Sequence, residues 1–83
     1  MEIVLTKHLR DKAAQRQIGL DVVDETVRNP DFTLPDPKDE ELRWHVKKYS
    51  GRCLVVIIKE EIGSLKGITV FYDRRLQRRG LCR

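Results

Sequence analysis

The sequence lacks any apolar run long enough to cross a membrane. Its longest, residues 53–58, has the length of a buried strand, whereas a membrane-spanning helix needs about 18 or more apolar residues. The first residues also lack the basic segment and the long apolar core of a signal peptide. These absences favour a cytoplasmic protein without a membrane partner.

Cysteine is scarce as well. The two cysteines, Cys53 and Cys82, are too few for a disulfide framework and lack the paired spacing of a zinc site. Cys53 lies inside the apolar run and is predicted to be a buried thiol, while Cys82, close to the last residue, is predicted to be mobile. Such use of cysteine is typical of a reducing compartment, which again favours the cytoplasm.

Short motifs of known chemistry are missing too. The chain has no glycine-rich phosphate loop, no nucleophile elbow, no metalloprotease histidine pair and no calcium-binding loop. The sequence therefore predicts neither a cofactor nor a bound metal. Any activity has to come from side chains that follow no strict catalytic motif.

What the sequence has in excess is positive charge, unevenly spread. Its 17 lysines and arginines oppose 13 acids, which gives a net charge of +4. Residues 74–83 carry five arginines and no acid, while residues 31–41 hold five acids and one lysine. A basic end of this kind indicates a polyanionic partner. The alternative is a solvated tail that keeps the protein soluble.

Apolar periodicity in the first half predicts short elements. Residues 3–5 are predicted to form a first strand. Thr6 is expected to cap a helix over about residues 7–17, and Asp21 a second helix that ends at Asn29 and Pro30. Residues 32–34 are predicted to form a short strand and residues 35–41 a loop.

The second half predicts a sheet. Polar and apolar residues alternate over residues 42–49, residues 52–59 are apolar on both faces, and residues 66–73 are β-branched and aromatic. Ser50 and Gly51 suit a two-residue hairpin turn. The expected fold is one α+β domain over residues 1–83: a short first strand, two helices and a three- or four-stranded, mainly antiparallel sheet. A basic tail is expected from about residue 74.

Two sets of basic residues are candidates for function. If the helices cover one face of the sheet, the alternation leaves the other face free, with Arg43, His45, Lys47 and Tyr49 on it. Cations there can hold phosphates, a tyrosine can stack on a base, and a histidine suits proton transfer. The alternative is an ordinary solvated sheet face.

The second set lies on the first predicted helix. His8, Lys12 and Arg16 are spaced four residues apart, which places them along one side of that helix as a basic ridge. The alternative is a solvated helix face on which His8 makes only local hydrogen bonds.

Several of these residues also resemble a family pattern. A bacterial family of uncharacterised small domains reads Ser/Thr-x-His, then two spaced arginines, Gly-Ile and Asn-Pro-Asp. Residues 6–18 and 29–31 are similar to that pattern, and so are residues 51–56 and 68–72 to its later strands. In this chain Leu9 replaces an alanine, Lys12 replaces the first arginine, and Gln17 occupies the position of the glycine.

That family resembles RelE-like and BrnT-like toxins of bacterial toxin–antitoxin systems. The resemblance implies a RelE-like α+β fold and a metal-independent ribonuclease (mRNA interferase) that cuts RNA free or on the ribosome. It also implies a cognate antitoxin protein as partner.

We therefore predict a toxin-like, RNA-directed protein. The residues predicted for catalysis are His8, His45, Lys12 and Arg16. The residues predicted to bind RNA are Arg43, Lys47, Tyr49, Arg52, Tyr72, Arg74 and Arg75. The alternative is a non-catalytic protein-interaction or nucleic-acid-binding module, and exposed strand edges leave room for a homodimer.

Overall fold

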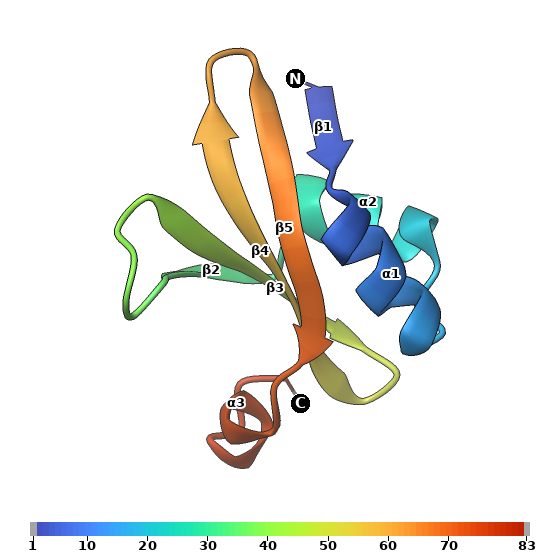
Figure 1. Cartoon of the computed structure of the whole chain (residues 1–83). Helices are drawn as coiled ribbons and strands as arrows, with labels where there is room; N and C mark the ends of the chain where they lie inside the picture. Colours follow the sequence, from blue (N-terminus) through green and yellow to red (C-terminus); the bar gives the residue numbers. More distant parts are fainter. Residues whose placement is uncertain (1, 83) are drawn as a thin grey trace.

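The computed structural model describes residues 2–82 and shows an α+β protein built on one five-stranded sheet (Figure 1). The predicted fold class is confirmed. The elements follow the order β1 (Glu2–Leu5), α1 (Lys7–Gln15), α2 (Leu20–Arg28), β2 (Phe32–Pro35), β3 (Leu42–Tyr49), β4 (Arg52–Glu61), β5 (Ser64–Tyr72) and α3 (Arg74–Arg78).

The strands lie in the order β1-β5-β4-β3-β2, so the apolar β4 is central, as its composition predicts. β2 to β5 form an antiparallel meander. β1 adds an edge strand parallel to β5, with Leu5 opposite Gly67. The predicted turn between β3 and β4 is present: Ser50 and Gly51 both have positive φ angles, of 52° and 73°, as tight hairpin turns require.

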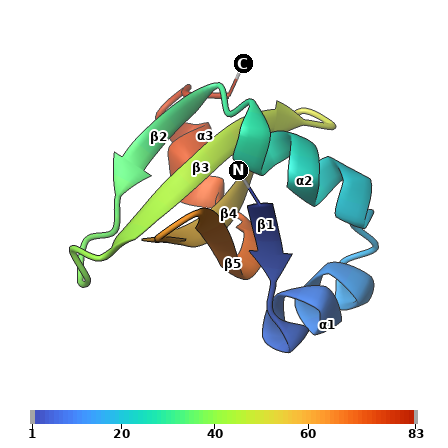
Figure 2. The ribbon, with the colours of Figure 1, turned by 90° about the horizontal axis from the view of Figure 1, so that it is seen from above.

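α1 and α2 lie on one face of the sheet (Figure 2). Thr6 caps α1 as predicted, because its Oγ1 accepts a hydrogen bond from the Leu9 amide at 3.1 Å. α2 is capped by Gly19, and Asp21 lies in the first turn instead. Both helices bury their apolar stripes against the sheet. This core consists of Leu9, Ala13, Ile18, Val23, Val27, Leu54, Val56, Ile58 and Val70.

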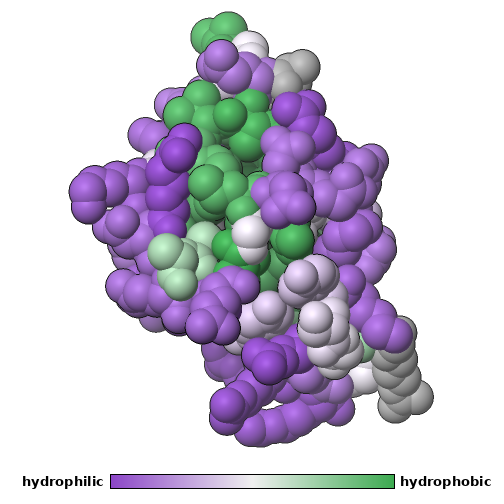
Figure 3. All heavy atoms as spheres, turned by 90° about the vertical axis from the view of Figure 1, so that its right-hand side faces the viewer, coloured by the Kyte–Doolittle hydropathy of each residue, from purple (hydrophilic) through white to green (hydrophobic). Residues whose placement is uncertain are grey.

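The two helices diverge from each other, and the side of the molecule that carries them shows an apolar strip between polar surfaces (Figures 2 and 3). Ile3, Leu5, Val22 and Leu65 pack against the core but are only partly buried. The helical layer thus covers this face of the sheet incompletely.

The opposite face carries a second core, under α3. It consists of Val46, Cys53, Val55, Leu76 and Cys82, with Trp44 and Phe71 packed edge to face at a ring-centre distance of 5.5 Å. α3 begins where Oδ1 of Asp73 accepts a hydrogen bond from the Leu76 amide at 3.0 Å. Most of the predicted basic tail is therefore an ordered helix and turn, while Arg83 lies outside the described residues.

The predictions for the two cysteines are wrong. Cys53 and Cys82 form a disulfide, with their Cα atoms 5.4 Å apart, and Cys82 is only 8% exposed. Two residues 29 positions apart carry no signature of pairing in the sequence. Because disulfides persist mainly in oxidising compartments, the argument from cysteine for the cytoplasm loses its premise, and that location stays a prediction.

Within residues 2–82, no helix is long and apolar enough to cross a membrane.

Candidate functional site

The sheet face predicted to be open is not the face that carries the polar side of β3. The strand register pairs His45 with Val56 and Arg43 with Ile58, and these apolar partners belong to the core beneath α1 and α2. The polar side of β3 therefore shares its face with those helices, while its apolar side, with Val46, packs under α3. The prediction was wrong because α3 covers the second face.

Arg43 and Lys47 make contacts within the fold. Nη2 of Arg43 donates a hydrogen bond to Oγ1 of Thr33 at 2.9 Å. Nζ of Lys47 donates to the carbonyl of Asn29 at 2.8 Å and lies 3.6 Å from the carboxylate of Asp31. Both cations brace the segment that leads from α2 into β2, which accounts for their positions without RNA.

His45 is half-buried beside the end of α2. Its Nδ1 lies 2.9 Å from the carbonyl oxygen of Val27, and since that oxygen can only accept, Nδ1 carries the proton. Partial burial lowers the pKa of His45 from its usual value, although the hydrogen bond to Val27 acts in the opposite direction. His45 is thus a neutral, structurally engaged imidazole at neutral pH.

The basic ridge on α1 ends at a different place from His45. His8 is exposed in the first turn of α1, Lys12 is half-buried further along, and Arg16 is the residue that ends the helix. α1 packs on β5, whereas His45 lies on β3, with β4 between the two strands. The structure therefore keeps the two predicted catalytic histidines apart, and of the ridge only Arg16 reaches a hollow.

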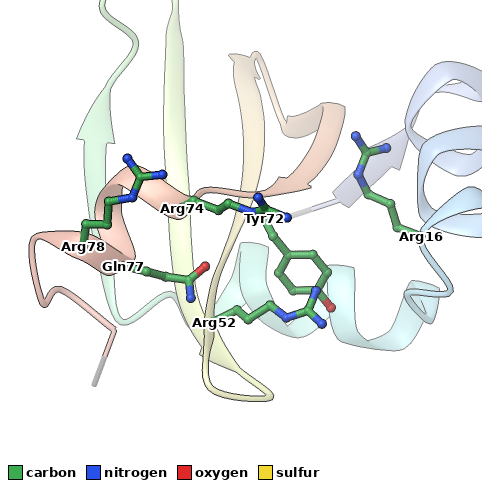
Figure 4. Close-up of a pocket in the computed structure, with 6 residues that line it drawn as sticks. All are labelled: Arg16, Arg52, Tyr72, Arg74, Gln77 and Arg78. Atoms are coloured by element: carbon green, nitrogen blue, oxygen red, sulfur yellow. The ribbon is translucent and has the colours of Figure 1, made fainter.

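That hollow lies where the end of β5 leads into α3 and has a volume of about 610 Å³ (Figure 4). Four predicted site residues meet there, together with two that were not predicted. We call it the arginine pocket; its lining residues are Arg16, Arg52, Tyr72, Arg74, Gln77 and Arg78.

Strand pairing explains why these residues meet. β4 starts where β5 ends, and Leu54 lies opposite Tyr72, so Arg52 is the diagonal neighbour of Tyr72 on the same face. The guanidinium of Arg52 lies 4.6 Å from the centre of the Tyr72 ring (Figure 4). Arg16 comes from the end of α1, and Arg74 from the start of α3.

The pocket concentrates positive charge without compensation. Four arginines line it and no carboxylate does. Within the part of the chain that the structure describes, none of these arginines forms an ion pair. Guanidinium groups gathered in one hollow repel one another, so an anion that enters it replaces repulsion by charge-assisted hydrogen bonds. The arrangement is that of an anion-binding site.

The remaining predicted RNA-binding residues lie outside the pocket. Tyr49 is 39% exposed and pairs with Arg52 across the hairpin, so it is a neighbour of the pocket without lining it. Arg75 points to the other side of α3, where it lines a second groove.

Gln77 and Arg78 are the pocket residues that sequence reasoning missed. They lie one turn beyond Arg74, and a helical reading of residues 74–78 would have placed all three on one side. The signal was weak because this helix has five residues and one buried apolar side chain, Leu76.

Among the described residues, no group of three or more histidine, cysteine, aspartate and glutamate side chains is placed to hold a metal ion. Comparisons of the chain with protein-family models, with curated proteins and with solved structures found no match. The function of the chain has to be argued from the arginine pocket itself.

Proposed function

We propose that this chain is an RNA-directed protein of the toxin type, similar to RelE-like and BrnT-like proteins, and that it holds the RNA backbone in the arginine pocket. The observation that carries the proposal is the set of four unpaired guanidinium groups around one tyrosine ring. The cognate antitoxin and the ribosome as the place of action belong to the same proposal.

The chemistry of the pocket suits a nucleic acid better than a small organic acid. Guanidinium groups bind phosphate oxygens in a bidentate manner, and four of them exceed what one carboxylate needs. A positively charged hollow with an aromatic side chain is how single-stranded nucleic acids are held, since the cations follow the backbone and a base stacks on the ring. Tyr72 supplies the ring, and Tyr49 lies close by for a second base.

RNA cleavage has less support from the geometry than RNA binding. Metal-free cleavage requires a group that removes the 2′-hydroxyl proton and one that protonates the leaving oxygen. Of the four residues predicted for catalysis, only Arg16 lines the pocket, and it can stabilise charge but does not transfer protons. Binding is therefore the activity we propose first, and cleavage by His8 or His45 is a second step tested separately.

The binding proposal is tested with a fluorescently labelled single-stranded RNA, titrated at several salt concentrations. The double substitution Arg52→Ala, Arg74→Ala should weaken binding strongly and reduce the slope of log affinity against log salt by about two, one for each lost phosphate contact. The matched control is Arg10→Ala, Arg28→Ala, which removes the same charge from exposed positions outside the pocket. Equal weakening in both variants would show diffuse attraction and would contradict a site in the pocket.

The toxin part of the proposal has its own test. Induced expression should arrest bacterial growth, and the pocket double variant should relieve the arrest. If growth stops and RNA is cut, the substitutions His8→Ala and His45→Ala, made singly, identify which histidine takes part. Normal growth under full expression of the folded protein would refute the toxin activity and leave RNA binding to stand or fall by the titration.

A further inference from the structure

A second hollow lies on the other side of α3 from the arginine pocket. Its volume is about 430 Å³, and it runs between α3 and the hairpin of β2 and β3. Apolar side chains dominate its floor. The residues that line it are Leu34, Pro35, Pro37, Trp44, Asp73, Arg75, Leu76 and Arg79. We call it the tryptophan groove.

The two walls of the tryptophan groove carry opposite charge. On the α3 wall stand Arg75 and Arg79. The other wall, with Pro35 and Pro37, continues into the loop over residues 36–41, which holds four acids and one lysine. Figure 1 shows this loop and α3 projecting from the body of the molecule as separate ends.

Parts of this loop are already used within the chain, and parts are not. Asp36 accepts a hydrogen bond from Nε1 of Trp44 at 2.8 Å, and Glu41 lies 3.5 Å from Lys59. Asp39 and Glu40 are exposed and form no ion pair with any residue in the described range.

The same holds for the opposite wall, because neither Arg75 nor Arg79 is in an ion pair within residues 2–82. Each copy of the chain thus presents an apolar groove with two free acids on one rim and two free cations on the other.

Such a surface is complementary to itself. A two-fold axis through the groove, between its walls, exchanges the two rims, so the acidic loop of one copy faces α3 of the other, and the reverse contact forms as well. The apolar floors, with Trp44 and Leu76, then meet near the axis, where contacts between copies are shielded from water. Charge pairs of this kind set the register and the partner, while apolar burial supplies the free energy.

We propose that the tryptophan groove is the interface of a homodimer, formed by a second copy of this chain in an antiparallel, two-fold arrangement. The dimer leaves both arginine pockets accessible, since those lie on the other side of each α3. The proposal does not depend on the RNA-binding function.

The test uses two charge-reversal variants of the full chain, studied by analytical ultracentrifugation. The variant Arg75→Glu, Arg79→Glu makes both rims acidic, and the variant Asp39→Lys, Glu40→Lys makes both rims basic. Each variant alone should be monomeric at concentrations where the parent is a dimer. An equal mixture of the two should form a heterodimer, because each acidic rim then meets a basic one in both contacts. Circular dichroism confirms that both variants are folded.

Trp44 is the only tryptophan of the chain, so its fluorescence should shift to shorter wavelength on dimerisation. The matched control is Arg74→Glu, Arg78→Glu, an equal charge change on the opposite side of α3, which should remain dimeric. A parent protein that stays monomeric up to millimolar concentration would overturn the proposal. So would a mixture of the two variants that fails to associate.

Discussion

The guanidinium of Arg52 lies against the ring of Tyr72, 4.6 Å from its centre, across the boundary between two strands. Arg52 opens β4 and Tyr72 ends β5, and their diagonal placement on one face of the sheet fixes both side chains at the rim of the arginine pocket. One partner provides charge and the other an aromatic surface, so the two contributions to RNA binding can be separated by substitution.

Replacing Tyr72 should reduce affinity for RNA without changing its dependence on salt. Base stacking on an aromatic ring contributes about 1–3 kcal/mol per base and involves no release of counterions. We expect Tyr72→Leu to weaken binding while the salt slope stays that of the parent. Tyr72→Phe is the matched control and should keep most of the affinity. A reduced slope in Tyr72→Leu would mean that the ring only positions Arg52.

Removing the disulfide should loosen α3 and with it one wall of the arginine pocket. A cross-link that closes a loop of this length contributes about 2–4 kcal/mol to the free energy of unfolding. Cys82→Ser should lower stability in urea by about that amount and weaken RNA binding, because Arg74 and Arg78 lose their anchor. The parent should show the same changes in reductant, whereas Cys82→Ser should not respond to reductant. Free thiols in the purified, unreduced parent would contradict the pairing.

The stability of the protein should fall as pH drops below about 6.5, in part through His45. Burial lowers the pKa of His45 in the folded state, so between the unfolded pKa, about 6.5, and the lower folded value the unfolded chain binds the extra proton. The stability that the neutral imidazole provides is therefore complete above that range and is lost through it as pH falls.

The substitution His45→Asn tests this, because asparagine can still donate to the Val27 carbonyl but does not titrate. Urea unfolding between pH 7 and pH 5 should show a weaker pH dependence for His45→Asn than for the parent. If His8→Asn removed the dependence instead, the assignment to His45 would be wrong.

Gly67 should not tolerate a side chain. A Cβ at this position would lie 2.9 Å from the Cδ2 of Leu5 and 2.9 Å from the Cδ1 of Leu9. Leu9 is fully buried and has no space to move into, so Gly67→Ala should lower the free energy of unfolding by about 1–3 kcal/mol. The loss should be smaller when Gly67→Ala is made in a Leu5→Ala background, since one of the two contacts is then gone. Equal losses in both backgrounds would place the strain elsewhere.

The strands and their faces differ in how far the sequence predicts them. The alternation over residues 42–49 predicts a strand correctly, because a period of two is a local property. Which of its faces the helices cover is not local, since it depends on what packs on the other side. The apolar face of β3 is covered by α3, whose single buried side chain, Leu76, gives no recognisable amphipathic pattern.

The same reasoning explains which part of the candidate site was predictable. Arg52 and Tyr72 belong to strands whose type and order were correctly predicted, and antiparallel pairing places the start of one beside the end of the other. Arg78 belongs to a helix that exists through a cap at Asp73 and a disulfide at Cys82. Neither of these contacts has a spacing rule that could be applied to the sequence alone.

The parallel pairing of β1 with β5 joins two parts of the chain that are far apart in sequence. Oγ1 of Thr6 donates a hydrogen bond to the carbonyl of Ile68, 62 positions later, while each hairpin of the meander closes over a few residues. Long-range contacts form more slowly than local ones because closing the larger loop costs more entropy. We therefore expect the Thr6 amide, which donates to the Gly67 carbonyl, to gain protection late in pulse-labelled hydrogen exchange during refolding. The strand that comes first along the chain is then the last to be secured, and assembly of the sheet runs against the order of synthesis.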